Sequence, residues 1–411
     1  MDSDPSRPGQ ALRLLTENFG KLEPHNQNKM EGLLQDKKLH LVLDLDRTLL
    51  STTLLESMTS EEEYLKRRAK PDVSKGKGSL FILKKIYKDD MVTKLRPFVR
   101  KFLKVASKMY VLHIYTMGNR SYALAIVNIL DPRREYIKGI IISRDDVITK
   151  KNEKTLDVIP GPESAILILD DNEKVWRKHN RNLIIMEQYN YFRSSFRKSK
   201  SKFKSYSEMK SDESATEGNL ATVLKVLKKI HYMFFDESNR DKLIDRDVRQ
   251  VYKSVQNEVL KGCKILFLMN FLIDNPKNHP RLWNMANRLG ATCSTEYDPS
   301  VTHVVSRDFG TRGSRWAVKE KKILVHPRWL EAAYIMWKKQ PEEDFPVTQT
   351  MKAYHPHFIK QMFTLLVFEE VKKLFSQNHD GFDEKMKRSY GTLLIFLSTY
   401  WFDFKLEKLG K

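Results

Sequence analysis

Two closely spaced carboxylates follow an apolar run near the start of the sequence. In "LVLDLDRTLL", residues 41–50, Asp44 ends the run, Asp46 follows two places later, and Thr48 comes two places after that. Buried acids are costly, so we expect this pair where the chain leaves the core. Carboxylates at such a place can attack phosphorus or transfer protons. The spacing alone is also compatible with a helix cap, so other residues have to decide.

Polar groups also end two later apolar runs. The run "LHIYT" ends at Thr116, and the run "LILDD" ends at Asp170 and Asp171. In a parallel sheet the carboxyl ends of the strands share one edge, and ligands bind beyond that edge. We therefore expect residues more than 120 positions apart, from Asp44 to Asp171, to meet at one site.

A cluster of carboxylates requires a cation that offsets the repulsion between them. Mg²⁺ accepts a few protein oxygens and leaves positions for water and phosphate. The predicted ligands are Asp44, Asp46 and Asp171, with Asp170 beside them. Within this cluster we expect Asp44 to be a nucleophile, Asp46 a general acid and base, and Thr48 a hydrogen-bonding residue that holds the loop.

Phosphoryl transfer also requires donors and positive charge around the phosphate oxygens. Arg96 in "KLRPF" and Lys154 in "NEKTL" are the candidate cations, and Thr116 is a neutral donor. Because "TKKNEK" contains three lysines, Lys150 and Lys151 are alternatives to Lys154.

The elements that position these residues follow from the hydrophobic pattern. The short apolar runs "LHLVLD", "MYVLHIYT", "KGIIIS" and "AILILDD" alternate with amphipathic stretches such as "FVRKFLKVASK" and "RSYALAIVNIL". This alternation predicts an α/β domain, a parallel sheet with flanking helices, over residues 38–195. A hairpin is expected in "FILKKIYKDDMVTKL", with its turn at Asp89 and Asp90.

The rest of the chain divides by composition. We predict a flexible N-terminal arm over 1–37, a basic linker and helical segment over 196–257, a second small α/β domain over 258–347, and a tail over 348–411 whose role is unknown. A length of 411 residues fits two domains with linkers.

Composition narrows the class of partner and the compartment. Lysine and arginine outnumber aspartate and glutamate by 73 to 52, and the net charge of +21 favours an anionic partner such as phosphoprotein, RNA or DNA. Neither a zinc-finger spacing nor the stacked aromatics of an RNA-binding sheet is present, so nucleic acid is not expected to be the primary ligand. Two cysteines indicate a reducing, cytosolic or nuclear, setting. Without an apolar stretch of about 18 residues, no membrane partner is expected.

Taken together, the motifs resemble the haloacid dehalogenase (HAD) superfamily, and within it the Fcp-type phosphatases of the RNA polymerase II carboxy-terminal domain. The segments "LVLDLDRTLL", "KLRPFVRKFL", "LHIYTMGNRSYA", "ISRDD" and "LILDDNEKVWRKHNRNLI" stand in family order. The resemblance implies that Asp44 is the nucleophile of a DxDxT motif and Asp46 its acid and base. It also implies that Mg²⁺ is held by Asp44, the backbone carbonyl of Asp46, and Asp171, with Asp170 in support.

The same resemblance assigns substrate contacts. Thr48, Arg96 and Thr116 match the family's motif threonine, its "RP" arginine and the threonine of "YTMG". Tyr110 and Tyr122 are implied to line the substrate groove, and the lysine near Lys154 to contact phosphate.

The second domain resembles a BRCT domain. The segments that carry this resemblance are "LKGCKILF", "LGATCSTEYDPSVTHVVS" and "RWAVKEKKILVHPRWLEAAYIMWKKQPEEDF". Trp329 in "HPRWL" lies on an apolar helical face and is expected in its core.

The expected function is therefore a Mg²⁺-dependent protein serine phosphatase that forms an aspartyl phosphate. By resemblance its substrate is the phosphorylated repeats of RNA polymerase II, its setting is the nucleus, and general transcription factors are further candidate partners. The alternative is a non-catalytic scaffold that binds phosphoproteins of the transcription machinery. The complete set of aspartates favours the enzyme, because a scaffold does not require a nucleophile.

Overall fold

The computed structural model describes residues 32–69, 78–84, 89–146, 153–196, 204–238, 242–267 and 279–347. Lys150, Lys151, most of the predicted N-terminal arm and the whole predicted tail lie outside the described residues.

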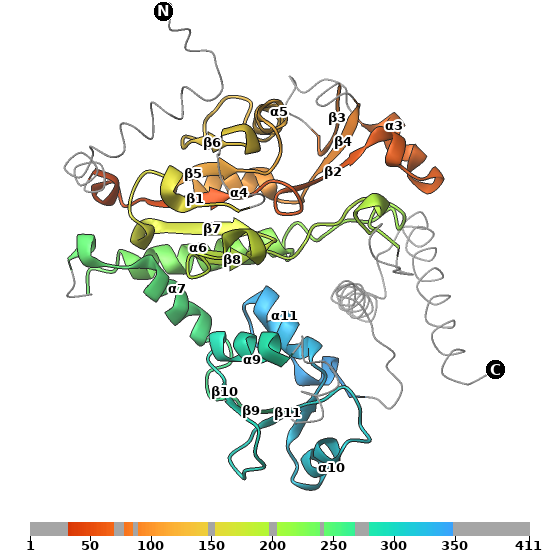
Figure 1. Cartoon of the computed structure of the whole chain (residues 1–411), viewed down its shortest axis with the longest axis vertical. Coiled ribbons are helices and arrows are strands. Elements are labelled where there is room, and N and C mark those ends of the chain that lie inside the picture. The colour runs from red at the N-terminus through yellow and green to blue at the C-terminus, as the bar shows by residue number, and fades with distance from the viewer. Residues whose placement is uncertain are drawn as a thin grey trace, which may run out of the picture. The chain divides into compact units, whose positions relative to one another are not determined.

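A five-stranded parallel sheet forms the centre of the first domain (Figure 1). Its strands are β1 (Leu39–Leu43), β5 (Tyr110–Tyr115), β6 (Ile141–Ile142), β7 (Ile166–Asp170) and β8 (Leu183–Ile185), in the order β6-β5-β1-β7-β8. Each neighbouring pair is parallel, so all five carboxyl ends lie at one edge. This confirms the predicted α/β fold.

Alternate residues of the strands face two separate apolar clusters. Leu41 and Leu43 of β1 pack in a cluster with the helices α4 (Val99–Ala106) and α5 (Arg120–Leu130). Val42 packs on the opposite face, with residues of the 3-10 turns η4 (Leu156–Val158) and η6 (Glu173–Trp176). Because both faces are covered, the strands are apolar along their length and turn polar only where they end.

A small antiparallel sheet follows β1 in the chain. It contains β2 (Leu50–Leu54), β4 (Met91–Leu95) and β3 (Leu80–Leu83), in the order β2-β4-β3. Strands β3 and β4 pair directly, with Leu83 opposite Met91, and they are the predicted hairpin. Strand β2, which the sequence pattern did not indicate, pairs with the other side of β4. A short helix, α3 (Glu63–Arg68), lies between β2 and β3 in the chain.

The region predicted as a linker and separate helical segment belongs instead to the first core. Helices α6 (Asn219–Phe234) and α7 (Val248–Asn257) contribute Leu227, Ile230 and Tyr252 to the same apolar cluster as β1. Before them, residues 204–218 include the buried Ser205, Tyr206 and Ser207. Composition indicated a linker because this stretch is polar, but several of its polar groups bond to the first domain: Ser207 Oγ donates to Glu62, and Glu213 pairs with Arg96.

A second, four-stranded parallel sheet lies in the predicted BRCT region. It consists of β9 (Lys264–Phe267), β10 (Thr292–Ser294), β11 (His303–Val305) and β12 (Ile323–Val325), ordered β10-β9-β11-β12. Within the described residues of this region, the helices are α9 (His279–Arg288), α10 (Arg312–Lys319) and α11 (Arg328–Met336). Trp329 of α11 is fully buried, as predicted.

Among the helices of the described ranges, none combines the length and the apolar character that crossing a membrane requires.

Candidate active site

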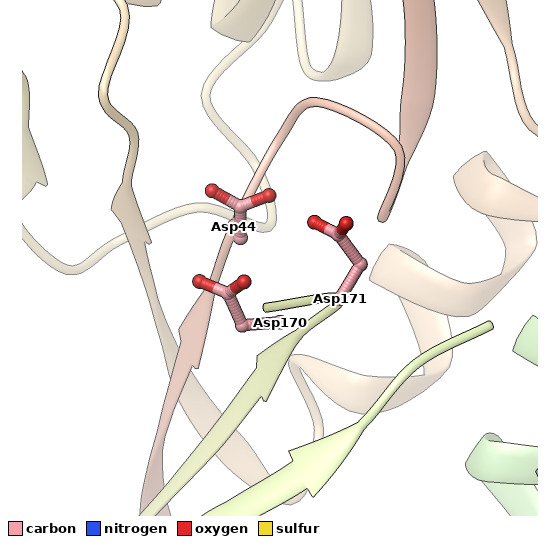
Figure 2. A group of neighbouring side chains, drawn as sticks. All are labelled: Asp44, Asp170 and Asp171. Carbon is pink, nitrogen blue, oxygen red and sulfur yellow. The ribbon is translucent and has the colours of Figure 1, made fainter. Parts of the chain in front are cut away.

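Three aspartates meet at the carboxyl edge of the first sheet. Asp44 directly follows β1, Asp170 is the last residue of the neighbouring β7, and Asp171 comes next. One carboxylate oxygen from each lies within 4.8 Å of the others, and the side chains surround one space beyond the strand ends (Figure 2). The sheet order thus brings together residues that the sequence separates widely.

Lys154 lies in this cluster and is almost completely buried. Its Nζ donates to Asp44 Oδ1 at 2.6 Å, to Asp170 Oδ2 at 2.7 Å and to the backbone carbonyl oxygen of Tyr115 at 2.9 Å. These three bonds use all three ammonium protons. The structure therefore places Lys154 beside Asp44 and Asp170, and the alternatives Lys150 and Lys151 lie outside the described residues.

The carboxylates of Asp170 and Asp171 are not equally available to bind a divalent cation. Both oxygens of Asp170 already accept hydrogen bonds, Oδ1 from Asn172 N at 2.8 Å and Oδ2 from Lys154 and the indole of Trp176. Asp171 Oδ2 is buried and forms an ion pair with Arg47 Nη2 at 3.1 Å, yet makes no hydrogen bond within the described part of the chain. A buried oxygen without a hydrogen bond beside Asp44 suits a hard cation, for which oxygen ligands are preferred.

Burial dominates the electrostatics of these acids. It raises the pKa of Asp44 well above its usual value, the nearby Asp170 raises it further, and Lys154 opposes both effects. Burial likewise raises the pKa of Asp171 to about 6, although Arg47 lowers it. Burial alone would lower the pKa of Lys154, but Asp44 and Asp170 raise it overall. The lysine is therefore a fixed positive charge, and a cation beside Asp44 and Asp171 would favour their ionised forms.

Asp46 lies on the loop after Asp44 and contacts a tyrosine. Tyr122 OH donates to Asp46 Oδ1 at 2.6 Å and lies 2.9 Å from Thr52 Oγ1. Burial raises the pKa of Asp46, and the bond from Tyr122 lowers it. The chain turns sharply at Arg47, between Asp46 and Thr48, where φ has the left-handed value of 63°. Such strained conformations persist where the surroundings enforce them, often at functional sites.

The two predicted threonines are both buried at the site. Thr116 follows β5, and its Oγ1 accepts from Gly118 N at 3.0 Å, which leaves the hydroxyl proton available to another acceptor. Thr48 Oγ1 makes no hydrogen bond among the described residues. The predicted loop-holding bond of the Thr48 hydroxyl is therefore not observed. Its carbonyl oxygen holds the loop instead, accepting from Arg96 Nη1 at 3.0 Å.

The structure corrects the prediction that Arg96 contacts substrate. The guanidinium is fully buried and forms a bidentate pair with Glu213, with distances of 2.8 and 2.6 Å. Nη1 also donates to the carbonyl oxygens of Thr48 and Glu187, at 3.0 and 2.9 Å. Because these donors bond to protein oxygens, Arg96 stabilises the DxDxT loop through the carbonyl oxygen of Thr48.

Tyr110 is also placed differently from the prediction. It is the first residue of β5 and pairs with Leu39, at the opposite end of the strands from Asp44. Its ring is buried and its hydroxyl donates to Leu227 O of α6 at 2.8 Å. Tyr110 therefore links β5 to α6, whereas the hydroxyl of Tyr122 contacts Asp46 in the site.

Three groups at the site were missed by the sequence analysis. They are Trp176, which donates to Asp170, Arg47, which pairs with Asp171, and the carbonyl oxygen of Tyr115. Arg47 stands inside the DxDxT motif and Trp176 shortly after "DD", so proximity to the acids was the available signal.

Two parts of the chain match known protein families. The family model of the NLI interacting factor-like phosphatases matches residues 39–231, and that of the BRCA1 C Terminus (BRCT) domain matches residues 255–333. "RNA polymerase II C-terminal domain phosphatase-like 4" of Arabidopsis thaliana is 52% identical over 78% of this chain and 72% of its own length. The chain belongs to the RNA polymerase II C-terminal domain phosphatase family.

Other members of the phosphatase family support the same assignment. "RNA polymerase II C-terminal domain phosphatase-like 3" of Arabidopsis thaliana is 36% identical over 82% of this chain and 27% of its own length. The solved "Structure of Fcp1, an essential RNA polymerase II CTD phosphatase" superposes with a TM-score of 0.61 at 23% identity, over 78% of this chain and 99% of that one. The superposition confirms the fold: an HAD-like sheet with a BRCT domain. The chain is a protein phosphatase with a C-terminal BRCT domain, which confirms the predicted family and enzyme class.

Proposed function

We propose that this phosphatase removes phosphate from serines of the RNA polymerase II carboxy-terminal repeats, in the nucleus, through a phosphorylated Asp44. The observation that supports it most is the contact of Lys154 with both Asp44 and Asp170, at 2.6 and 2.7 Å, beside Asp171 at the sheet edge. A buried cation that fixes one oxygen of Asp44 leaves the other oxygen for attack. The substrate is inferred from the names of the relatives.

In the first step Asp44 attacks the phosphorus atom. A P–O bond to the carboxylate forms as the P–O bond to the serine oxygen breaks, and Asp46 gives its proton to the leaving oxygen. Asp46 suits this role because burial raises its pKa, so that the protonated form is more populated than in an exposed aspartate. Lys154 and Thr116 contribute positive charge and a hydroxyl donor beside the transferring group.

In the second step water releases the phosphate. Asp46, now ionised, accepts a proton from a water molecule as the water oxygen bonds to phosphorus, and the bond to Asp44 breaks. Inorganic phosphate leaves, and both aspartates return to their starting states.

We further propose Mg²⁺ as the cofactor, held by Asp44, Asp171 and the backbone carbonyl of Asp46, with Asp170 as support. A bound Mg²⁺ would offset the negative charge of the carboxylates and of the phosphate oxygens. The unequal hydrogen bonding of Asp171 and Asp170 favours Asp171 as the direct ligand.

The domain boundaries are part of the proposal. We assign catalysis to the first sheet together with α6 and α7, and substrate docking to this unit and the BRCT domain jointly. General transcription factors remain candidate partners, and neither nucleic acid nor membrane is proposed as a primary ligand.

Hydrolysis of an aryl phosphate tests the reaction. We expect activity with Mg²⁺, loss on chelation with recovery when Mg²⁺ is restored, and a loss of at least about 1,000-fold in Asp44→Asn. Peptide repeats phosphorylated at one serine each then test the substrate. Activity that survives Asp44→Asn would exclude the phosphorylated intermediate, and phosphopeptide binding without hydrolysis would favour the scaffold.

A further inference from the structure

Trp176 has two kinds of contact with the catalytic cluster. Its indole Nε1 donates to Asp170 Oδ2 at 2.8 Å, the same oxygen that accepts from Lys154 at 2.7 Å. Its ring also flanks the lysine, whose Nζ lies 5.6 Å from the Trp176 ring and 5.5 Å from the Tyr115 ring. We propose that Trp176 is a positioning residue, which holds Asp170 and Lys154 so that Lys154 orients Asp44.

The hydrogen bonds of Asp170 leave its carboxylate a single orientation. Oδ1 is held by Asn172 N at 2.8 Å, and Oδ2 by the indole and the ammonium. Rotation of the carboxylate would break bonds on both sides. Without the indole donor, Lys154 alone would hold Oδ2, and the position of the lysine relative to Asp44 would be less well defined. Small displacements of such groups are costly in catalysis.

The ring contacts fix the lysine from the sides. The Tyr115 and Trp176 rings meet edge to face, with centroids 5.4 Å apart, and both lie within cation–π range of Lys154. Trp176 is itself fully buried in the apolar cluster on that face of the sheet. The two rings beside the ammonium exclude water, which strengthens the bonds of Lys154 to the carboxylates.

Core packing is the simpler explanation of a buried tryptophan, and the same chain provides a tryptophan that serves this purpose. Trp329 is also fully buried, and its Nε1 donates at 2.9 Å to a backbone carbonyl, that of Gln340 in the BRCT domain. Trp329→Phe therefore removes a similar ring area and a similar hydrogen bond without touching the site, and is the matched control for Trp176→Phe.

The inference rests on the proposed role of Asp44, so the experiment separates the two. In the full chain with Mg²⁺ and an aryl phosphate, we expect Trp176→Phe to lower kcat about tenfold or more with KM nearly unchanged, and Trp329→Phe to leave both unchanged. Because Trp176 acts through Asp170, the Trp176→Phe/Asp170→Asn double variant should be no less active than Asp170→Asn alone. Equal losses in the two Phe variants, or additive losses in the double variant, would overturn the proposal.

A spectroscopic measurement does not depend on activity or on a bound metal. In the metal-free full chain with ¹⁵N-labelled tryptophan, the Trp176 indole proton should resonate downfield because its acceptor is a carboxylate, and Asp170→Asn should shift it upfield while the Trp329 signal stays in place. An unmoved Trp176 signal would contradict the contact, even if Trp176→Phe failed to fold. If the wild-type chain hydrolyses nothing and Asp170→Asn still shifts the Trp176 signal, the proposed function is refuted but the contact between Trp176 and Asp170 is supported.

Discussion

At the scale of single residues, the contact between Asp46 and Tyr122 depends on a glycine. A Cβ atom added at Gly118 would lie 2.4 Å from Cδ1 of Tyr122, closer than side-chain atoms approach. The ring therefore occupies space that any larger residue at 118 would take. The position of Asp46, the proposed general acid, thus depends on a residue that has no functional side chain.

Two substitutions test this arrangement. Tyr122→Phe removes the 2.6 Å bond to Asp46 but keeps the ring, and we expect kcat to fall about tenfold. Gly118→Ala should lower kcat at least as much, because the methyl group displaces the ring. Steady-state kinetics with an aryl phosphate measure both.

Gly310 provides the control for the glycine substitution. The nearest atom to a Cβ at Gly310 is 3.4 Å away, an ordinary contact, so Gly310→Ala should retain full activity. Wild-type kinetics in Gly118→Ala would show that Tyr122 does not hold Asp46 in the working enzyme.

At the scale of elements, the segment 204–218 joins the catalytic loop to the helices that follow. Consecutive acids of this segment pair with two cations near the end of β4, Asp212 with Lys94 and Glu213 with Arg96. Arg96 in turn donates to the carbonyl oxygen of Thr48. The polar residues that indicated a linker therefore make the contacts that hold this segment on the catalytic domain.

We predict that Glu213→Gln destabilises the fold and weakens catalysis. The guanidinium of Arg96 would be left buried without its paired carboxylate, and breaking such a pair costs about 3 kcal/mol of unfolding free energy. Chemical denaturation should detect the loss, and kcat should fall as the Thr48 loop loosens.

The control for this substitution is Glu217→Gln, on the same segment. Glu217 is exposed, and removing its charge should change neither stability nor kcat measurably. Unchanged stability in Glu213→Gln would mean that the segment is not held by the Arg96 pair.

At the scale of the whole molecule, two buried histidines couple the stability of the sheet to pH. His113 Nδ1 accepts from Ile140 N at 3.1 Å, so Nε2 of His113 carries its proton and donates to His40 Nδ1 at 2.9 Å. Both rings are therefore neutral. Burial lowers the pKa of His40 from 6.5 to about 4 and that of His113 to about 3, with His40 lowering the latter further.

The contribution of these two histidines to stability should therefore fall in mild acid. The unfolded chain takes up protons at these histidines below about pH 6.5, whereas the folded chain does not until about pH 4. The stabilisation is fully present above pH 6.5 and declines as the pH falls toward 4. At pH 5 the protonation of the unfolded chain lowers the unfolding free energy by roughly 2 kcal/mol for each ring.

Urea unfolding at pH 7 and pH 5 measures this dependence. A His40→Asn/His113→Asn variant should be less stable at pH 7 but lose less stability between the two values. The same loss in variant and wild type would assign the pH dependence to other groups.

From sequence alone, the alternation of apolar runs determined the parallel sheet, and the acids at the ends of those runs determined the catalytic edge. Asp44, Thr116 and the Asp170–Asp171 pair were predicted from these local signals, because a polar residue after a buried strand is visible in any one segment. Helix α5 was likewise predicted, since the amphipathic stretch "RSYALAIVNIL" covers the same residues.

Contacts between distant segments were decided only in three dimensions. Arg96 and Tyr110 have the residue types of substrate ligands, yet one is neutralised by Glu213, 117 positions away, and the other bonds to Leu227 in α6. Trp176 was not predicted from its own segment, yet its indole donates to Asp170 at the edge of the sheet. The physical reason is that hydrogen-bond pairing and burial depend on which segments pack together, and a local pattern carries no information about the partner.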